Sequence, residues 1–190
     1  GFVMAALAAR FQFAAVSNEG RGFWVMRTGP ISAKEFLWAK AYPGILPMIL
    51  VGETLAVSSI TILDAQSAML WVGIGTAAAL SFGLSGIAVG MGAMYPDFKT
   101  SNASKLAASP AGLLYMLTAL GLVFAVLALE AFPVYWLIST QITERPITDT
   151  QWVIGSICLL LALGLCMFAT FYPINYGARK LWERELPNGS

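Results

Sequence analysis

Long apolar runs separated by short polar segments form the pattern of this chain. Four runs are long enough to cross a membrane as helices, because a span needs about 20 apolar residues; they are residues 41–63, 68–94, 111–129 and 152–172. A shorter run, residues 1–16, is interpreted as the end of a span that is truncated upstream. The pattern predicts an all-α, polytopic transmembrane helical bundle in a single domain, residues 1–190, with four complete spans.

Residues 17–40, between the first two runs, mix aromatic and cationic side chains. Arg21 and Arg27 bracket Phe23, Trp24 and Met26. Indole rings and guanidinium groups are typical of the boundary between a membrane and water. We therefore expect a short amphipathic piece at the membrane surface.

A sharp turn and a new helix are expected directly after that piece. Pro30 breaks the segment, and Ser32 and Glu35 have the spacing of a capping box, in which the hydroxyl and the carboxylate each accept a bond from a backbone amide. A helix should begin near Ala33. We call residues 17–40, with their turn and capped helix start, the elbow.

The second run carries a polar face. Glu53, Thr54, Ser58, Thr61 and Asp64 fall on one side of a helix at 100° per residue. A charged side chain in mid-span costs about 2.5–3.5 kcal/mol on insertion scales, so Glu53 should face protein or water, or be protonated. Two interpretations stay open: a polar lining of a substrate path or proton-coupled site, and an interhelical hydrogen-bond seam or subunit interface.

The third run has small residues at steps of three and four. Such residues let helix backbones approach closely, so we interpret this face as a packing surface. The face comprises Gly75, Ala79, Gly83, Gly86, Gly90 and Ala93.

Three polar or interrupted segments complete the chain. Residues 95–108 form a loop that ends in Ser109 and Pro110, a cap residue followed by proline at the first helical position. Residues 130–138 are too short and interrupted for a span, and their Tyr-Trp pair suits a membrane interface. Residues 173–190 read as an amphipathic tail at the membrane surface.

Composition agrees with a membrane protein. The chain is 58% hydrophobic and 11% charged, whereas soluble domains average about 25% charged residues. Histidine is absent and the two cysteines lie in an apolar run, so we expect no disulfide framework, catalytic set, metal site or cofactor. No run of basic residues points to nucleic acid.

The basic residues predict the orientation. With the elbow inside, nine basic residues face the cytoplasm and one faces out, which is a strong positive-inside bias that makes the C-terminus cytoplasmic. The nine are Arg21, Arg27, Lys34, Lys40, Lys99, Lys105, Arg179, Lys180 and Arg184, against Arg145 outside.

The elbow resembles the first cytoplasmic loop of type-2 ABC exporter permeases. The matching residues are Glu19, Thr28, Pro30, Ile31, Ser32, Glu35, Phe36, Leu37 and Lys40. A second segment, Gly90–Leu117, resembles one branch of ABC-2-type permeases. It has a Tyr-Pro-x-Phe motif, residues 95–98, then a loop with Asn and Lys and a Gly-Leu-Leu-Tyr helix start.

The resemblance implies a membrane-spanning permease subunit of the exporter type in the inner or plasma membrane. It implies a separate ATPase that docks on the elbow, a second permease unit in a homodimer or pseudo-dimer, and a short re-entrant segment at residues 130–138. The implied coupling residues are Glu19, Arg21, Phe23, Trp24, Met26, Arg27, Pro30, Ser32 and Glu35. ATP hydrolysis would belong to the partner, because this sequence contains no Gly-x-x-x-x-Gly-Lys-Ser/Thr.

Two other classes of function remain open on the sequence. An ion-coupled secondary transporter would use Glu53 as its titrating group. A membrane scaffold would need no transport chemistry at all. An ATPase gene adjacent to this one would favour the permease interpretation.

Overall fold

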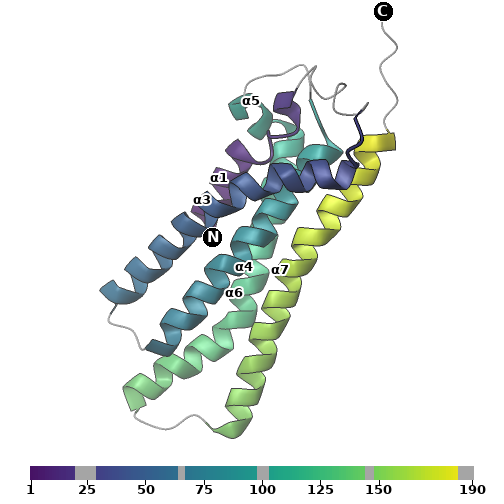
Figure 1. Cartoon of the computed structure of the whole chain (residues 1–190). Helices are drawn as coiled ribbons and strands as arrows, with labels where there is room; N and C mark the ends of the chain where they lie inside the picture. The colour runs from purple at the N-terminus through teal and green to yellow at the C-terminus, as the bar shows by residue number, and fades with distance from the viewer. Residues whose placement is uncertain (20–28, 64–66, 98–102, 144–147, 184–190) are drawn as a thin grey trace, which may run out of the picture.

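The computed structural model describes residues 1–19, 29–63, 67–97, 103–143 and 148–183 (Figure 1). In these ranges every regular element is a helix, as predicted. The elements are α1 (Phe2–Phe11), the 3₁₀ helix η1 (Ser17–Glu19), α3 (Ala33–Ile62), α4 (Ser67–Met94), α5 (Ala103–Ala107), α6 (Pro110–Thr143) and α7 (Asp149–Glu183). Four of them, α3, α4, α6 and α7, are long and apolar enough to cross a membrane. The all-α class with four spans is therefore confirmed.

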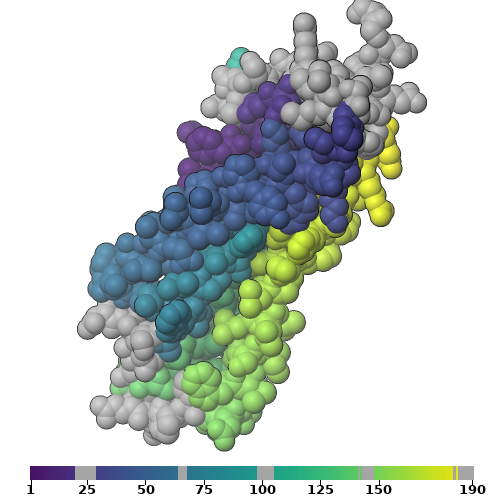
Figure 2. All heavy atoms as spheres, viewed as in Figure 1, coloured from purple at the N-terminus to yellow at the C-terminus, as the bar shows by residue number. Residues whose placement is uncertain are grey.

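The four long helices lie side by side and alternate in direction (Figure 1). The start of α3, the end of α4, the start of α6 and the end of α7 meet at one end, which we call the elbow end; the opposite end is the far end. In the space-filling view α3 and α7 cover much of one face, with α4 visible between them (Figure 2). In its most apolar window α4 is 56% buried, against 17% for α3, so α4 is the central helix.

Local sequence signals start two of the long helices. At α3 the Glu35 amide donates to Ser32 Oγ at 3.3 Å, and the Ser32 amide donates to Glu35 Oε2 at 2.9 Å, so the predicted capping box is formed. At α6 the Gly112 amide donates to Ser109 Oγ at 3.1 Å, with Pro110 as the first helical residue.

The first helix, α1, is shorter than a span and is held by polar contacts. The Tyr115 hydroxyl of α6 donates to the Ala5 carbonyl at 3.0 Å. Just beyond α1, Gln12 Nε2 donates to Ser85 Oγ of α4 at 2.9 Å. A Cβ atom on Gly44 of α3 would lie 2.1 Å from Gln12 Nε2, so glycine makes room for this amide.

Two apolar clusters form the core. The larger joins α1 to α3, α4, α6 and α7. The smaller, which we call the elbow-end cluster, joins the first turns of α3 to the ends of α4 and α7; its buried members are Val16, Phe36, Leu37, Ala41, Ile45, Val89, Ala93, Ile174, Ala178 and Leu181.

The structure corrects the interpretation of residues 130–138. They are not a re-entrant segment, because α6 runs without a break through Pro133 to Thr143. Proline removes one backbone donor, but a membrane helix tolerates it where neighbouring groups satisfy the freed carbonyl. Likewise α7 continues through Pro173 to Glu183 and buries Ile174 and Leu181, so the first part of the tail belongs to the last helix.

Candidate functional site

The described part of the elbow is fixed to the spans by an ion pair. Lys40 of α3 donates to Glu19 of η1, which joins the two ends of the elbow. Pro30 and Ser32 are exposed at the turn. Five of the predicted coupling residues lie outside the described residues: Arg21, Phe23, Trp24, Met26 and Arg27.

The capped start of α3 rests on α7. Phe36 and Leu37 are buried in the elbow-end cluster. Next to them the rings of Trp38 and Phe171 lie with centroids 5.5 Å apart. Because close-packed interiors deform little, a displacement of this helix start moves the end of α7 with it.

The polar face of α3 points away from the other described helices. Thr54, Ser58 and Thr61 are exposed, and their hydroxyls donate to carbonyls of α3 itself. Glu53 is half-buried. Within the described residues these groups form no hydrogen-bond seam to a neighbouring helix, and the face is free for lipid, a second unit or a path.

The small residues of α4 meet the backbone of α7 in its elbow-end half. A Cβ atom on Gly86 would lie 2.4 Å from Thr170 Cα, and one on Gly90 would lie 2.4 Å from the Pro173 carbonyl carbon. Glycine is required at both positions by this close approach. Gly83 meets Leu122 of α6, where a Cβ atom would lie 2.9 Å from Cδ2.

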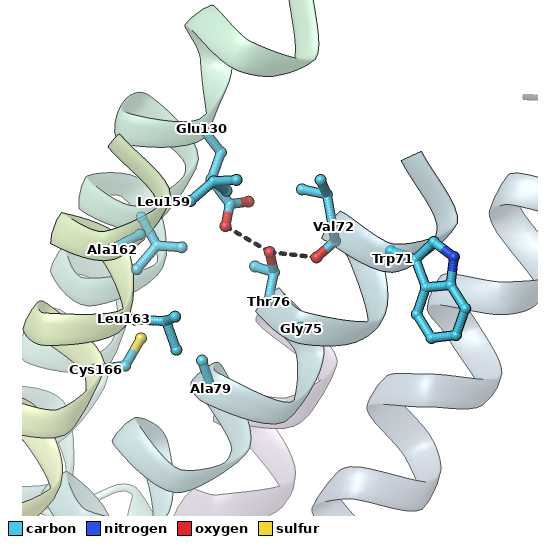
Figure 3. Close-up of a pocket in the computed structure, with 11 residues that line it drawn as sticks. Trp71, Val72, Gly75, Thr76, Ala79, Glu130, Leu159, Ala162, Leu163 and Cys166 are labelled. Atoms are coloured by element: carbon cyan, nitrogen blue, oxygen red, sulfur yellow. Dashed lines mark hydrogen bonds between the residues drawn. The ribbon is translucent and has the colours of Figure 1, made fainter. Parts of the chain in front are cut away.

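Toward the far end the same two helices diverge. A Cβ atom on Gly75 would meet nothing within 4 Å. Their divergence leaves a cavity of about 270 Å³ between α4, α6 and α7 (Figure 3). Its lining residues are apolar or small except for one pair; they are Trp71, Val72, Gly75, Thr76, Ala79, Val126, Glu130, Leu159, Ala162, Leu163 and Cys166.

The exception is the pair Thr76 and Glu130. Thr76 Oγ1 lies 2.5 Å from Glu130 Oε1 and 2.8 Å from the Val72 carbonyl oxygen, and the close-up shows the carboxyl group of α6 pointing at the hydroxyl of α4 (Figure 3). Glu130 is only 8% exposed. It lies about 30 Å along α6 from Pro110, at 1.5 Å per residue, and so well inside the helix.

The hydroxyl has one proton for two acceptors. If Glu130 is ionised, it accepts the Thr76 proton; if Glu130 is protonated, it donates to Thr76, which then donates to Val72. The pair is therefore a group that can hold a negative charge or a proton inside the bundle. Within the described ranges no cation is paired with Glu130, whereas Lys40 pairs with Glu19.

A second cavity, of about 500 Å³, adjoins the pair from the other side. It lies between α1, α3, α4 and α6 and shares Val72, Thr76 and Glu130 with the first. Glu53 lines neither cavity. Its neighbour Gly52 lies level with Ala77, because a Cβ atom on Gly52 would be 3.5 Å from Ala77 Cβ. Glu53 and Glu130 thus lie at similar depth in the bundle.

Sequence reasoning missed this pair. It assigned residues 130–138 to a membrane interface because they are too short and interrupted for a separate span and carry a Tyr-Trp pair. The signal that could have found it is Glu130 itself, a single acidic residue in an apolar stretch that continues from residue 111 past residue 138. The described residues contain no group of three potential metal ligands.

Comparisons with known proteins add one result. No curated protein and no solved structure matches the chain. One family model matches residues 1–186, and its description is "Putative ATP-binding cassette". Because that match covers nearly the whole chain, the chain belongs to this ATP-binding-cassette family.

Proposed function

We propose that this chain is the membrane-spanning permease subunit of an ATP-binding-cassette transporter, of the exporter type, driven by a separate ATPase subunit that docks on the cytoplasmic elbow. The observation that carries the proposal is the family match over a chain of four apolar, span-length helices. A membrane subunit and an ATPase are the two roles that such a family offers.

Sequence chemistry supports the membrane role. ATP-binding cassettes hold the nucleotide phosphates in a glycine-rich P-loop with a lysine. This chain contains no Gly-Lys pair anywhere. Its glycines instead lie in an apolar helix, where Gly86 and Gly90 allow contact with α7. The chain has the composition of a membrane subunit rather than of a nucleotide-binding module.

The elbow supplies a route for mechanical coupling. An ATPase that pushes on the elbow moves the capped start of α3, whose residues Phe36 and Leu37 pack against α4 and α7. The ion pair between Lys40 and Glu19 ties η1 to the same helix. The movement therefore reaches the helices that border the cavity at Glu130. A second unit, facing the polar side of α3, would complete the transport path.

A second candidate is an ion-coupled transporter. Glu130, buried beside Thr76 and between two cavities, is the observation that favours it. Such a protein would transport its substrate without any ATPase. The sequence-based alternative that uses Glu53 belongs to the same class, since Glu53 is a second acidic residue at similar depth.

Photolabelling with azido-ATP separates the two roles within the family. The tagged chain is purified in mild detergent from its own host and irradiated with the labelled nucleotide. The proposal predicts that the tagged chain stays unlabelled while a co-purifying chain of different mass is labelled and hydrolyses ATP. Labelling of the tagged chain itself, competed by ATP, would overturn the membrane-subunit role.

A further inference from the structure

The cavity between α4, α6 and α7 has the shape and charge of a ligand site. Its volume, about 270 Å³, holds a small organic molecule. Its walls are apolar except where Thr76 and Glu130 meet. The cavity lies where α4 and α7 diverge, and a Cβ atom on Gly75, which lines it, would meet nothing within 4 Å.

Glu130 sets the sign of the charge that this cavity accepts. An acidic side chain within a span is expensive and is retained where it serves binding or conduction. The described residues give Glu130 a hydroxyl partner and no cationic partner. A cation entering the cavity would supply the missing counter-charge in a setting where water is scarce.

A bare metal ion does not fit the same walls. Ca²⁺ takes 6–8 oxygen ligands and Mg²⁺ an octahedral set. Near Glu130 the described structure offers the carboxyl oxygens, the Thr76 hydroxyl and the Val72 carbonyl. Beyond these, leucine and alanine side chains such as Leu159 and Ala162 fill the lining. These walls favour a cation that carries its own apolar body.

We propose that this cavity binds a small lipophilic organic cation, an amine or quaternary ammonium compound, with its charge at Glu130 and its apolar part against Leu159, Ala162 and Leu163. The assignment deepens the proposed transport function by naming a substrate class. Thr76 orients the carboxylate, and the divergence of α4 and α7 provides the space.

Equilibrium dialysis of the purified chain in detergent tests the proposal with two isosteric probes. Benzyltrimethylammonium carries the charge, and neopentylbenzene has carbon in place of the ammonium nitrogen; detergent without protein serves as the blank. The cation should bind more tightly than its neutral isostere. Glu130→Gln should weaken binding of the cation by about 30-fold or more, the effect of removing one partner of a buried charge pair.

The control is Glu53→Gln, which removes an acidic side chain of similar depth that lines neither cavity. It should change the affinity by less than about twofold, as expected for a residue that lines neither cavity and shares no partner with Glu130. Equal binding of the two probes to the unmodified chain, or full affinity in Glu130→Gln, would overturn the proposal. If Glu130→Gln does not fold, the probe pair alone decides. No ATPase takes part, so this result and the photolabelling result can fail independently.

Discussion

Thr76 and Glu130 lie 54 residues apart in the chain, yet the Thr76 hydroxyl is 2.5 Å from the Glu130 carboxyl oxygen. This contact joins the central helix α4 to α6 at the border of two cavities. Among the described residues, it is the one hydrogen bond between α4 and α6 whose two partners both line both cavities. The free energy of this contact can be measured by unfolding, without knowledge of any transport substrate.

A double-mutant cycle of Thr76→Val and Glu130→Met, each of which removes one hydrogen-bonding partner, should give a coupling free energy between about 0.6 kcal/mol, the average for interhelical hydrogen bonds within membranes, and about 1.7 kcal/mol, the upper limit. Thr76→Val leaves the Glu130 carboxyl group without its hydroxyl partner, so this single variant should lower the free energy of unfolding. Unfolding in mixed micelles of mild detergent and dodecyl sulfate measures both quantities. A coupling energy of zero would mean that the contact does not stabilise the bundle.

Gly90→Ala should destabilise the fold by about 1–3 kcal/mol, because the added methyl group would lie 2.4 Å from the Pro173 carbonyl carbon of α7. Gly75→Ala is the matched control on the same helix. Its methyl group meets nothing within 4 Å, so the better helix propensity of alanine should stabilise by up to about 1 kcal/mol. The same unfolding titration compares the two, and equal effects would contradict the observed divergence of α4 and α7.

The basic residues predict an orientation with the elbow in the cytoplasm, which is testable in intact cells. In a variant with Cys158 and Cys166 replaced, single cysteines at Lys34, Asn102 and Asn188 should be protected from an impermeant thiol reagent. A cysteine at Glu144 should be labelled. The reverse pattern would put the elbow outside, where no ATPase could dock.

Glu53→Gln tests the ion-coupled alternative. If the polar face of α3 contacts lipid or a second unit, the amide keeps its hydrogen bonds, and the change costs about 1 kcal/mol or less and leaves transport intact. Transport measured in vesicles over a range of pH should then keep its pH dependence. Complete loss of transport by a variant that still inserts would favour a titrating role and contradict the permease account.

The sequence predicted what local patterns determine. Apolar runs of sufficient length gave the four spans, and the Ser32 and Glu35 spacing gave the start of α3. The pair Thr76 and Glu130 could not be predicted, because the contact depends on how α4 packs against α6. No local sequence pattern specifies that packing. The full length of α6 was not predicted, because a proline such as Pro133 interrupts helices in water. In a membrane bundle neighbouring groups satisfy the freed backbone carbonyl, and α6 continues to Thr143.

The elbow should be the docking surface of the ATPase. Trp24→Ala combined with Arg27→Glu removes an aromatic anchor and reverses a charge, so it should weaken ATPase binding by about 2 kcal/mol or more, the scale of a hot-spot residue. Glu35→Ala is the matched comparison within the elbow. It removes half of the capping box at the start of α3, so it should reduce stimulation of ATP hydrolysis by transport substrate more than it reduces binding.

The most direct measurement is the dissociation constant of the co-purified ATPase for this chain in nanodiscs, with and without the double substitution Trp24→Ala and Arg27→Glu. The account predicts that the unmodified chain binds the ATPase and that the double variant binds about 30-fold or more weakly while it inserts normally. Binding of the ATPase to the double variant at full affinity would contradict the account and leave the elbow as a membrane anchor.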